Sequence, residues 1–319
     1  MRTVRPYWSA RATAVAMPAS AASVDTTLSA RCIAHPLKLG TLGHLEYYSS
    51  ICWSSRYNMA MGYIVDTHCH IHDDEFNFDV DSVFNEAKIA EVGQMICIGT
   101  SAEDSQKAVD FAKKYNGVWA SVGLHPHDAK LGEDDFEILA RLIGENTVVA
   151  VGECGLDYYY DNSPRNDQIK ALEYQLQLAV SSNKPCIFHV REAFADFWGV
   201  LKNFPDVKGV IHSFSESIEN AKIAVENGLF VGLNGIISFK NSEDLRTVAR
   251  QIPIGSIVLE TDAPFLTPTP LRGTINVPAN VRLVAACLAE VRGESLAQLI
   301  EATTSNAHSL FGLDPSQII

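Results

Sequence analysis

The chain has 319 residues, of which 47% are hydrophobic and 20% are charged. These values are typical of a globular protein with one large domain or two small ones. No apolar run approaches the roughly 20 residues that a membrane-spanning helix needs, so we expect no membrane partner. The net charge of −13 argues against a protein that coats duplex DNA with a basic surface. It does not exclude an enzyme that holds phosphate through bound cations.

The first sixty residues differ from the rest in composition and charge. Residues 1–60 are rich in Ala, Ser and Arg and carry six basic against two acidic residues, whereas residues 61–319 carry 19 against 36, a net charge of −17. Three explanations stay open for this N-terminal extension: an organellar transit peptide, a start assigned too early (with Met59 or Met61 as the true start), or an additional disordered segment. In each case we expect the folded domain to span 61–319 and to begin near Gly62.

The seven cysteines include no C-x-x-C pair, and their number is odd. Cys97 and Cys186 lie in apolar runs, which indicates buried thiols in a reducing compartment. We therefore expect a cytoplasmic protein, or an organellar one if residues 1–60 are a transit peptide. Cys69 and Cys154 stand next to candidate ligands, but side chains alternate along a strand, so we expect their thiols to face away from the site.

From residue 62 on, short apolar runs alternate with helix-like stretches eight times. The apolar runs predict strands at 63–65, 94–98, 118–124, 148–151, 185–188, 209–211, 229–233 and 256–259. Helices are predicted at 80–92, 102–115, 133–144, 164–182, 193–203, 217–227, 242–251, 279–292 and 295–311. Eight such repeats over about 250 residues predict an α/β fold, a (β/α)₈ TIM barrel. A doubly wound open sheet is the alternative, but no G-x-G-x-x-G loop opens a helix.

Polar residues recur where the predicted strands end. Six histidines lie just past a strand's carboxyl end, at positions 68, 70, 125, 127, 189 and 212. Glu153 and Asp262 take the same place on the fourth and eighth strands. Each residue alone has an ordinary explanation, such as a buried core histidine, a helix cap or a turn. Together they favour a metal site at the carboxyl ends of the strands, because these ends meet on one face of a barrel.

The candidate ligands are too many for one zinc ion, which usually takes three protein groups and a water. They are His68, His70, Glu153, His189, His212 and Asp262. This set suits two divalent ions that share Glu153 as a bridge; imidazole and carboxylate ligands fit Mg, Mn, Zn or Fe. Two ions about 3.5–4 Å apart can clamp a phosphoryl group and activate a water. Asp262 can then bind one ion and accept the water's proton, so Glu153 and Asp262 are the candidate catalytic residues.

Eight motifs, in order over residues 62–312, resemble the TatD family of metal-dependent deoxyribonucleases, which belong to the amidohydrolase-like barrels. They are D-T-H-C-H (66–70), G-L-H-P-H (123–127), G-E-C-G-L-D-Y (152–158), F-H-V-R (188–191), I-H-S-F (211–214), E-T-D-A-P (260–264), P-x-P-L-R-G (268–273) and N-x-P-x-N (276–280). The resemblance covers nearly the whole predicted domain. The extension 1–60 is not required by the family's fold.

The resemblance implies a divalent-metal phosphodiesterase that degrades DNA, as a 3′–5′ exonuclease on single-stranded ends. It assigns one ion to His68, His70, Glu153 and Asp262, and the other to Glu153, His189 and His212. It places His125 and Arg191 on the substrate side. Asn234 and Arg272 are further substrate-binding candidates, and like Asp157 and Asn280 they are equally well explained as supporting hydrogen bonders. We expect a monomer that acts on DNA, with RNA as an open alternative.

Two rival functions remain at this stage. The same barrel can support a hydrolase of a carboxylic ester, amide or aminoacyl ester, because an activated water attacks a carbonyl as well as phosphorus. Many such enzymes bridge their ions with a carboxylated lysine, whereas here Glu153 takes that place. A binding protein without activity would have lost ligands, and none is lost. The rings at 158–160 either stack on a base or pack their loop onto the barrel rim.

Overall fold

The computed structural model describes residues 62–319. The predictions made for residues 1–60 therefore lie outside the described residues. Within 62–319, none of the helices combines the length and the apolar character that crossing a membrane requires.

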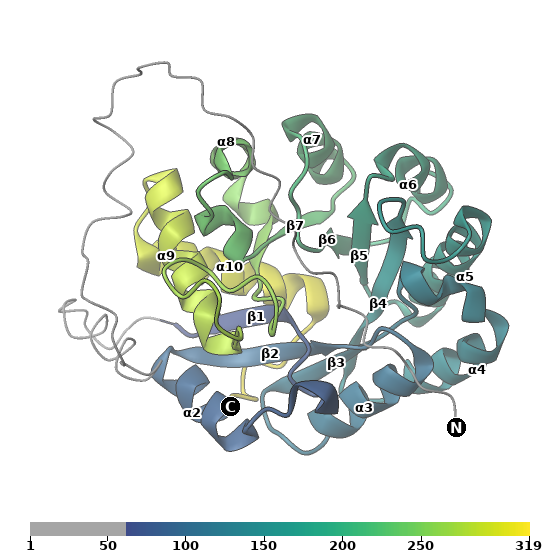
Figure 1. Ribbon diagram of the computed structural model, residues 1–319, viewed down its shortest axis with the longest axis horizontal. Coiled ribbons are helices and arrows are strands. Elements are labelled where there is room, and N and C mark those ends of the chain that lie inside the picture. Colours follow the sequence, from purple (N-terminus) through teal and green to yellow (C-terminus); the bar gives the residue numbers. More distant parts are fainter. Residues whose placement is uncertain (1–61) are drawn as a thin grey trace. The chain divides into compact units, whose positions relative to one another are not determined.

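The described residues form the predicted barrel of parallel strands alternating with helices (Figure 1). The strands follow one another in sequence order from β1 to β8, each paired in parallel with the next. They are β1 (Ile64–Cys69), β2 (Val92–Ile98), β3 (Val118–Val122), β4 (Val148–Asp157), β5 (Cys186–Arg191), β6 (Gly209–Ile211), β7 (Phe230–Leu233) and β8 (Ile257–Leu259). One isolated bridge, between Cys69 and Ala263, joins the end of β8 to β1, so the barrel is nearly closed.

Helices follow the strands and cover the outside of the barrel. They are α2 (Val80–Ile89), α3 (Ala102–Ala112), α4 (Glu133–Leu142), α5 (Arg165–Ser182), α6 (Phe194–Leu201), α7 (Ile218–Glu226), α8 (Glu243–Gln251), α9 (Val281–Arg292) and α10 (Leu296–Phe311). Short 3₁₀ helices lie in the connections: η1 (Asp74–Phe76), η2 (Pro126–Leu131), η3 (Gly235–Ser238), η4 (Ile254–Ser256) and η5 (Pro278–Asn280). Every predicted element has a counterpart among these, with ends that differ by a few residues.

The largest difference concerns β4, which its apolar run predicts at 148–151. The pairing of β4 with β5 continues to Asp157, which lies opposite Arg191. Gly155 permits this approach, because a Cβ atom there would lie 1.9 Å from the carbonyl oxygen of His189. In the sequence Gly155 looks like the end of a strand, but in the structure it allows β4 and β5 to lie close together.

Strands β1 and β5 also continue beyond their apolar runs into the polar residues. The barrel thus holds part of the candidate site inside its strands, where backbone pairing restricts each Cα position. The candidate ligands within strands are His68, Glu153 and His189.

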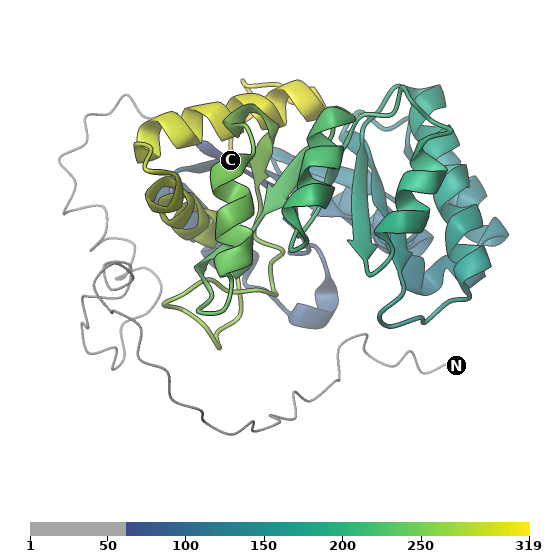
Figure 2. The same ribbon diagram turned by 90° about the horizontal axis from the view of Figure 1, so that it is seen from above.

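Apolar side chains close one end of the barrel. Val65, Ile96 and Ile187 from the strands cluster in the interior with Leu310 and Phe311 of α10. Figure 2 shows α10 at the end of the barrel opposite the strand arrowheads. The other end, where the strand carboxyl ends meet, is left for the polar residues.

The barrel is joined between β8 and β1 by a buried carboxylate. Asp66 accepts hydrogen bonds from the backbone N–H of Thr261 (2.8 Å) and from its hydroxyl (2.6 Å). Beside it, the N–H of Asp262 donates to the carbonyl of His68 (2.8 Å), and the N–H of His70 donates to that of Ala263 (2.7 Å). These contacts bring three candidate ligands from opposite ends of the domain's sequence to one place.

Replacing Asp66 by Ala should lower the free energy of unfolding by about 1–3 kcal/mol, because Thr261 would keep a buried N–H and hydroxyl without their acceptor. Asp66→Asn keeps one carbonyl oxygen for the N–H of Thr261 and should lose less. Urea unfolding followed by circular dichroism measures both variants. Equal stability of Asp66→Ala and wild type would contradict the role of this carboxylate in joining β8 to β1.

Candidate metal centre

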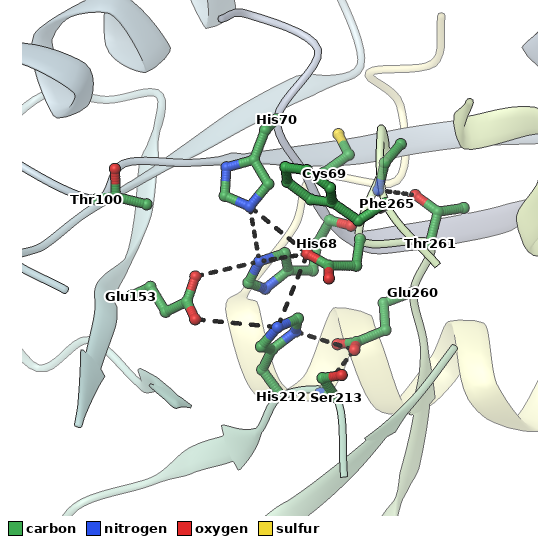
Figure 3. A network of polar contacts seen from close by, with 12 residues as sticks. His68, Cys69, His70, Thr100, Glu153, His212, Ser213, Glu260, Thr261 and Phe265 are labelled. Atoms are coloured by element: carbon green, nitrogen blue, oxygen red, sulfur yellow. Dashed lines mark hydrogen bonds and ion pairs between the residues drawn. The ribbon is translucent and has the colours of Figure 1, made fainter. Parts of the chain in front are cut away.

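Glu153 lies at the centre of the polar cluster, with 4% of its surface exposed. Its carboxylate oxygens lie 2.9 Å from His189 Nδ1, 3.4 Å from His68 Nε2, 3.5 Å from His125 Nε2 and 3.9 Å from His212 Nε2. Figure 3 shows Glu153, His68 and His212 pointing toward one another. The four imidazoles come from four different strand ends, so the barrel itself makes them converge.

Asp262 forms the other side of the cluster. Its Oδ1 atom lies 3.5 Å from His68 Nε2, 3.6 Å from His70 Nε2 and 3.8 Å from His212 Nε2. The two Nε2 atoms of His68 and His70 are 3.2 Å apart. Asp262 adopts a left-handed backbone conformation (φ 58°), which a residue without a glycine's freedom holds only when its surroundings fix it.

The donor atoms have the spacing that a shared ion requires. Two atoms bound to one ion at about 2.1 Å stand about 3.0–3.4 Å apart at octahedral to tetrahedral angles. The contacts of 3.2–3.6 Å among His68, His70, Glu153 and Asp262 lie close to that range. Imidazole nitrogens and carboxylate oxygens are also the ligands that Zn²⁺, Mn²⁺ and Fe²⁺ accept, so the residues present fit divalent ions.

The electrostatics of the cluster favour positive charge within it. Burial alone would lower the pKa of His212, but Glu260, Glu153 and Asp262 raise it to about 10. Burial would raise the pKa of Glu153, but the neighbouring histidines hold it well below its usual range. The same negative charge that keeps these carboxylates ionised and raises the pKa of His212 also attracts divalent cations.

Within 62–319, three groups of residues have ligand atoms close enough to hold an ion. Their grouping of His212 and His125 differs from the assignment that the family resemblance implies. The groups are His68, His70 and Glu153; His68, His212 and Asp262; and His125, Glu153 and His189. His212 therefore groups with His68, whose ring it stacks on at 3.5 Å, rather than with His189. The assignment of each ligand to one of two ions stays a prediction.

His125 joins the third group by position, but its hydrogen bonding points to another role. Burial lowers its pKa to about 4, so its imidazole is neutral near pH 7. Its Nδ1 atom accepts the backbone N–H of His127 (3.2 Å), which leaves the proton on Nε2, facing Glu153. A nitrogen that carries a proton cannot bind a metal. His125 is therefore better placed to donate a hydrogen bond, as expected for a residue on the substrate side.

Carboxylates behind the cluster orient two of the candidate ligands. Asp157 Oδ2 lies 2.9 Å from His189 Nε2, which leaves Nδ1 facing Glu153. Glu260 Oε1 lies 2.9 Å from His212 Nδ1, which leaves Nε2 facing the cluster. Such carboxylate–histidine pairs fix the ring and the ligating nitrogen at metal sites. Glu260 had no predicted role, although its place in E-T-D-A-P, two residues before Asp262, is a signal that could have identified it.

Two asparagines singled out in the sequence make hydrogen bonds within the domain. Asn234 is buried and donates to Glu260 Oε1 (3.1 Å) and Ser213 Oγ (3.0 Å), so it holds the carboxylate behind His212. Asn280 is buried too and donates to Asn276 Oδ1 (2.7 Å). A position in the chain does not reveal the direction of these side chains, and a contact of Asn234 with substrate stays a prediction.

Two arginines stack on aromatic rings. The Arg191 guanidinium lies 4.0 Å from the ring centre of Tyr159 and 4.8 Å from that of Tyr160. The Arg272 guanidinium lies 3.8 Å from that of Phe239. Within 62–319, neither arginine makes an ion pair with a carboxylate. Their positive charge is therefore free for an anionic ligand.

For the tyrosines at 158–160 the sequence left two roles open, stacking on a base or packing the loop onto the barrel rim. The structure favours a different role for Tyr158 than for Tyr159. The hydroxyl of Tyr158 donates to Asp196 (2.8 Å), so this ring packs its loop onto the barrel rim. Tyr159 is 54% exposed, and its ring is accessible for stacking.

The thiols beside the candidate ligands face other groups. Cys69 is buried with its Sγ 3.5 Å from the carbonyl oxygen of Ile96, and Cys154 has its Sγ 3.7 Å from that of Ile187. Buried His72 contacts partly buried Asp104 (3.0 Å), a pair that was not predicted, and joins the segment after β1 to α3.

Glu153→Gln keeps the side chain's shape and removes the charge that the imidazoles share. We expect Mn²⁺ to raise the melting temperature of the wild type, because a ligand that binds only the folded state adds about 2.7 kcal/mol at one hundred times its Kd. In Glu153→Gln this gain should largely disappear. Scanning fluorimetry over a Mn²⁺ titration measures it, with Glu226→Gln on α7 as the control. An undiminished gain in Glu153→Gln would show that the ion binds elsewhere.

Comparison with known proteins agrees with this geometry. The model of the family described as TatD related DNase matches residues 65–312. A Bacillus subtilis relative named uncharacterized metal-dependent hydrolase YabD is 33% identical over 254 residues, which are 79% of this chain and 100% of the relative. The Cronobacter sakazakii relative named 3′-5′ ssDNA/RNA exonuclease TatD is 36% identical over 250 residues, which are 76% of this chain and 95% of the relative.

Solved structures give the same result. The crystal structure of YJJV, a TatD homolog from Escherichia coli K12, has a TM-score of 0.74 and 32% identity, and the match covers 79% of this chain and 98% of that one. The phosphotriesterase homology protein of Escherichia coli shares the fold alone, with a TM-score of 0.58 and 14% identity. The chain belongs to the TatD family of metal-dependent hydrolases, enzymes that act on ester bonds.

Proposed function

We propose that this protein is a divalent-metal-dependent phosphodiesterase that shortens single-stranded DNA from its 3′ end. The observation that carries the proposal is Arg191, an arginine without a carboxylate partner that lies two residues beyond the candidate ligand His189 on β5. The phosphodiester group is itself an anion that such a cation can pair with, whereas a carboxylic ester or amide group is uncharged. Two relatives, from Cronobacter sakazakii and Citrobacter koseri, carry the name 3′-5′ ssDNA/RNA exonuclease TatD.

The reaction would use two divalent ions, held by the predicted ligands His68, His70, Glu153, His189, His212 and Asp262. When bound, such ions act as Lewis acids on the phosphodiester and lower the pKa of an attacking water. Asp262 lies at the edge of the cluster and can accept the proton that this water loses. His125 can donate its Nε2 proton to a phosphoryl oxygen, and Arg191 can hold the neighbouring phosphate.

The charge of the domain favours a strand end over a duplex. Residues 61–319 carry a net charge of −17, so most of the surface repels a phosphate backbone. Arg191, two residues beyond His189, and Arg272, in the loop after β8, would then provide the local positive charge. A base that stacks on Tyr159 would add about 1–3 kcal/mol and would require an unpaired nucleotide.

Purified protein should shorten end-labelled single-stranded DNA stepwise from its 3′ end, with Mg²⁺ or Mn²⁺ and not with chelator. Glu153→Ala should be inactive, because it removes the proposed bridge between the ions. Gel electrophoresis of 5′-labelled and 3′-labelled strands distinguishes the direction.

Absence of cleavage with any divalent metal, by folded and metal-loaded protein, would exclude the deoxyribonuclease. Carboxylic ester, amide and aminoacyl ester substrates would then be tested, since the metal site suits them as well. An RNA strand of the same sequence tests the preference between the two nucleic acids.

Arg191→Gln should weaken binding of a catalytically blocked oligonucleotide and reduce the slope of log K against log salt by about 1, as expected for the loss of one phosphate contact. Arg141→Gln, at an exposed position in the last turn of α4, removes the same charge away from the strand carboxyl ends and should leave the slope unchanged. Fluorescence anisotropy at several salt concentrations gives both slopes. The same slope for Arg191→Gln and wild type would remove Arg191 from the binding site.

A further inference from the structure

We propose that Asp157 is a positioning residue that couples the candidate metal ligand His189 to the loop of Tyr159 and Tyr160. Cation binding at His189 and ordering of this loop would then stabilise each other. The link between ligand and loop is independent of the substrate. The consequence for DNA, that a bound ion prepares the surface on which a base stacks, rests on the proposed function.

The two carboxylate oxygens of Asp157 contact different kinds of group: one faces histidine side chains and the other faces backbone N–H groups. Asp157 lies at the end of β4 and is fully buried. Its Oδ2 atom lies 2.9 Å from His189 Nε2 and 3.1 Å from His127 Nε2. Its Oδ1 atom accepts the backbone N–H groups of Tyr159 (3.0 Å) and Tyr160 (2.9 Å). One rigid group therefore holds both a candidate ligand and the start of the loop.

On the ligand side, Asp157 decides which nitrogen of His189 can bind an ion. A carboxylate accepts a proton donor, so His189 Nε2 carries the hydrogen and Nδ1 is left facing Glu153 at 2.9 Å. An ion that binds Nδ1 draws electron density from the ring, which strengthens the N–H donor toward Asp157. The position of Asp157 should thus become more fixed when His189 is bound.

On the loop side, Asp157 holds the backbone of the tyrosines and Arg191 contacts their rings. Asp157 pairs with Arg191 across β4 and β5, and the Arg191 guanidinium lies over both rings, at 4.0 Å and 4.8 Å. The rings of Tyr159 and Tyr160 are perpendicular to each other (89°), and that of Tyr160 also packs against His127. Movement of Asp157 would therefore change the direction of the exposed Tyr159 ring.

An aspartate that only closed the loop would be replaceable by asparagine. The amide oxygen of Asn can accept both tyrosine N–H groups, as Oδ1 does now. Its NH₂ group would face the N–H of His189, where two donors repel each other. Asp157→Asn therefore breaks the contact with the ligand and keeps the contacts with the loop.

Hydrogen exchange measured by mass spectrometry on the full chain tests the coupling. In wild type, Mn²⁺ should slow exchange in the peptide around the Tyr159 and Tyr160 amides by roughly 5- to 100-fold, the usual range of coupling between two sites. In Asp157→Asn the same peptide should exchange at nearly the same rate with and without Mn²⁺, with ion binding followed separately by electron paramagnetic resonance. Asp110→Asn on α3 is the matched control and should behave as wild type.

His189→Ala is the second variant, because it removes the ligand and leaves Asp157 and the loop unchanged. It too should lose the Mn²⁺ effect on exchange while the other candidate ligands still bind an ion. Equal protection by Mn²⁺ in wild type and in either variant would overturn the proposal, as would no protection in wild type with the ion bound.

The consequence for DNA has its own readout. An oligonucleotide ending in 2-aminopurine should lose fluorescence when this base stacks on the protein. In wild type the loss should be larger with Mn²⁺ than without it. In Asp157→Asn the loss should be the same with and without Mn²⁺. If the protein binds no DNA, the fluorescence stays constant in all samples. The exchange data then still decide whether Asp157 couples ligand and loop, so failure of the proposed function and failure of this inference are distinguishable.

Discussion

The rest of the site depends on one constraint, the burial of the Glu153 carboxylate at the barrel mouth. A charge removed from water costs several kcal/mol unless partners surround it. Glu153 meets this cost with four imidazoles, each from a different strand end, within 3.9 Å. Because the barrel brings all strand carboxyl ends to one face, a single buried acid can gather ligands that lie far apart in the chain. His68 in β1 and His212 directly after β6 are 144 positions apart, and both lie beside Glu153.

The two ends of the barrel serve different purposes. At one end, apolar side chains of the strands pack against Leu310 and Phe311 of α10, and this packing provides stability. At the other end, carboxylates support the candidate ligands: Asp66 joins β1 to the end of β8, Asp157 orients His189 and Glu260 orients His212. Burying these acids is costly; Asp66 offsets this cost through its hydrogen bonds with Thr261, and Asp157 and Glu260 fix the direction of an imidazole nitrogen.

The sequence was sufficient for the order of the elements and for most members of the polar cluster. Apolar runs of strand length alternate with helix-like stretches, and the position of a polar residue after such a run places it at the barrel mouth. The ends of β1, β4 and β5 were not predictable in this way, because parallel pairing continues through polar residues and through Gly155, where a side chain would collide with β5. The orientation of Asn234 toward Glu260 depends on a contact between two strands. Neither local pattern nor spacing contains that information.

Anomalous scattering from crystals soaked in Mn²⁺ tests the central claim most directly. The account predicts two peaks, each about 2.0–2.3 Å from an oxygen of Glu153, with His189 Nδ1 bound to one of them. A single peak, or two peaks that do not share Glu153, would contradict the two-ion centre built around this carboxylate.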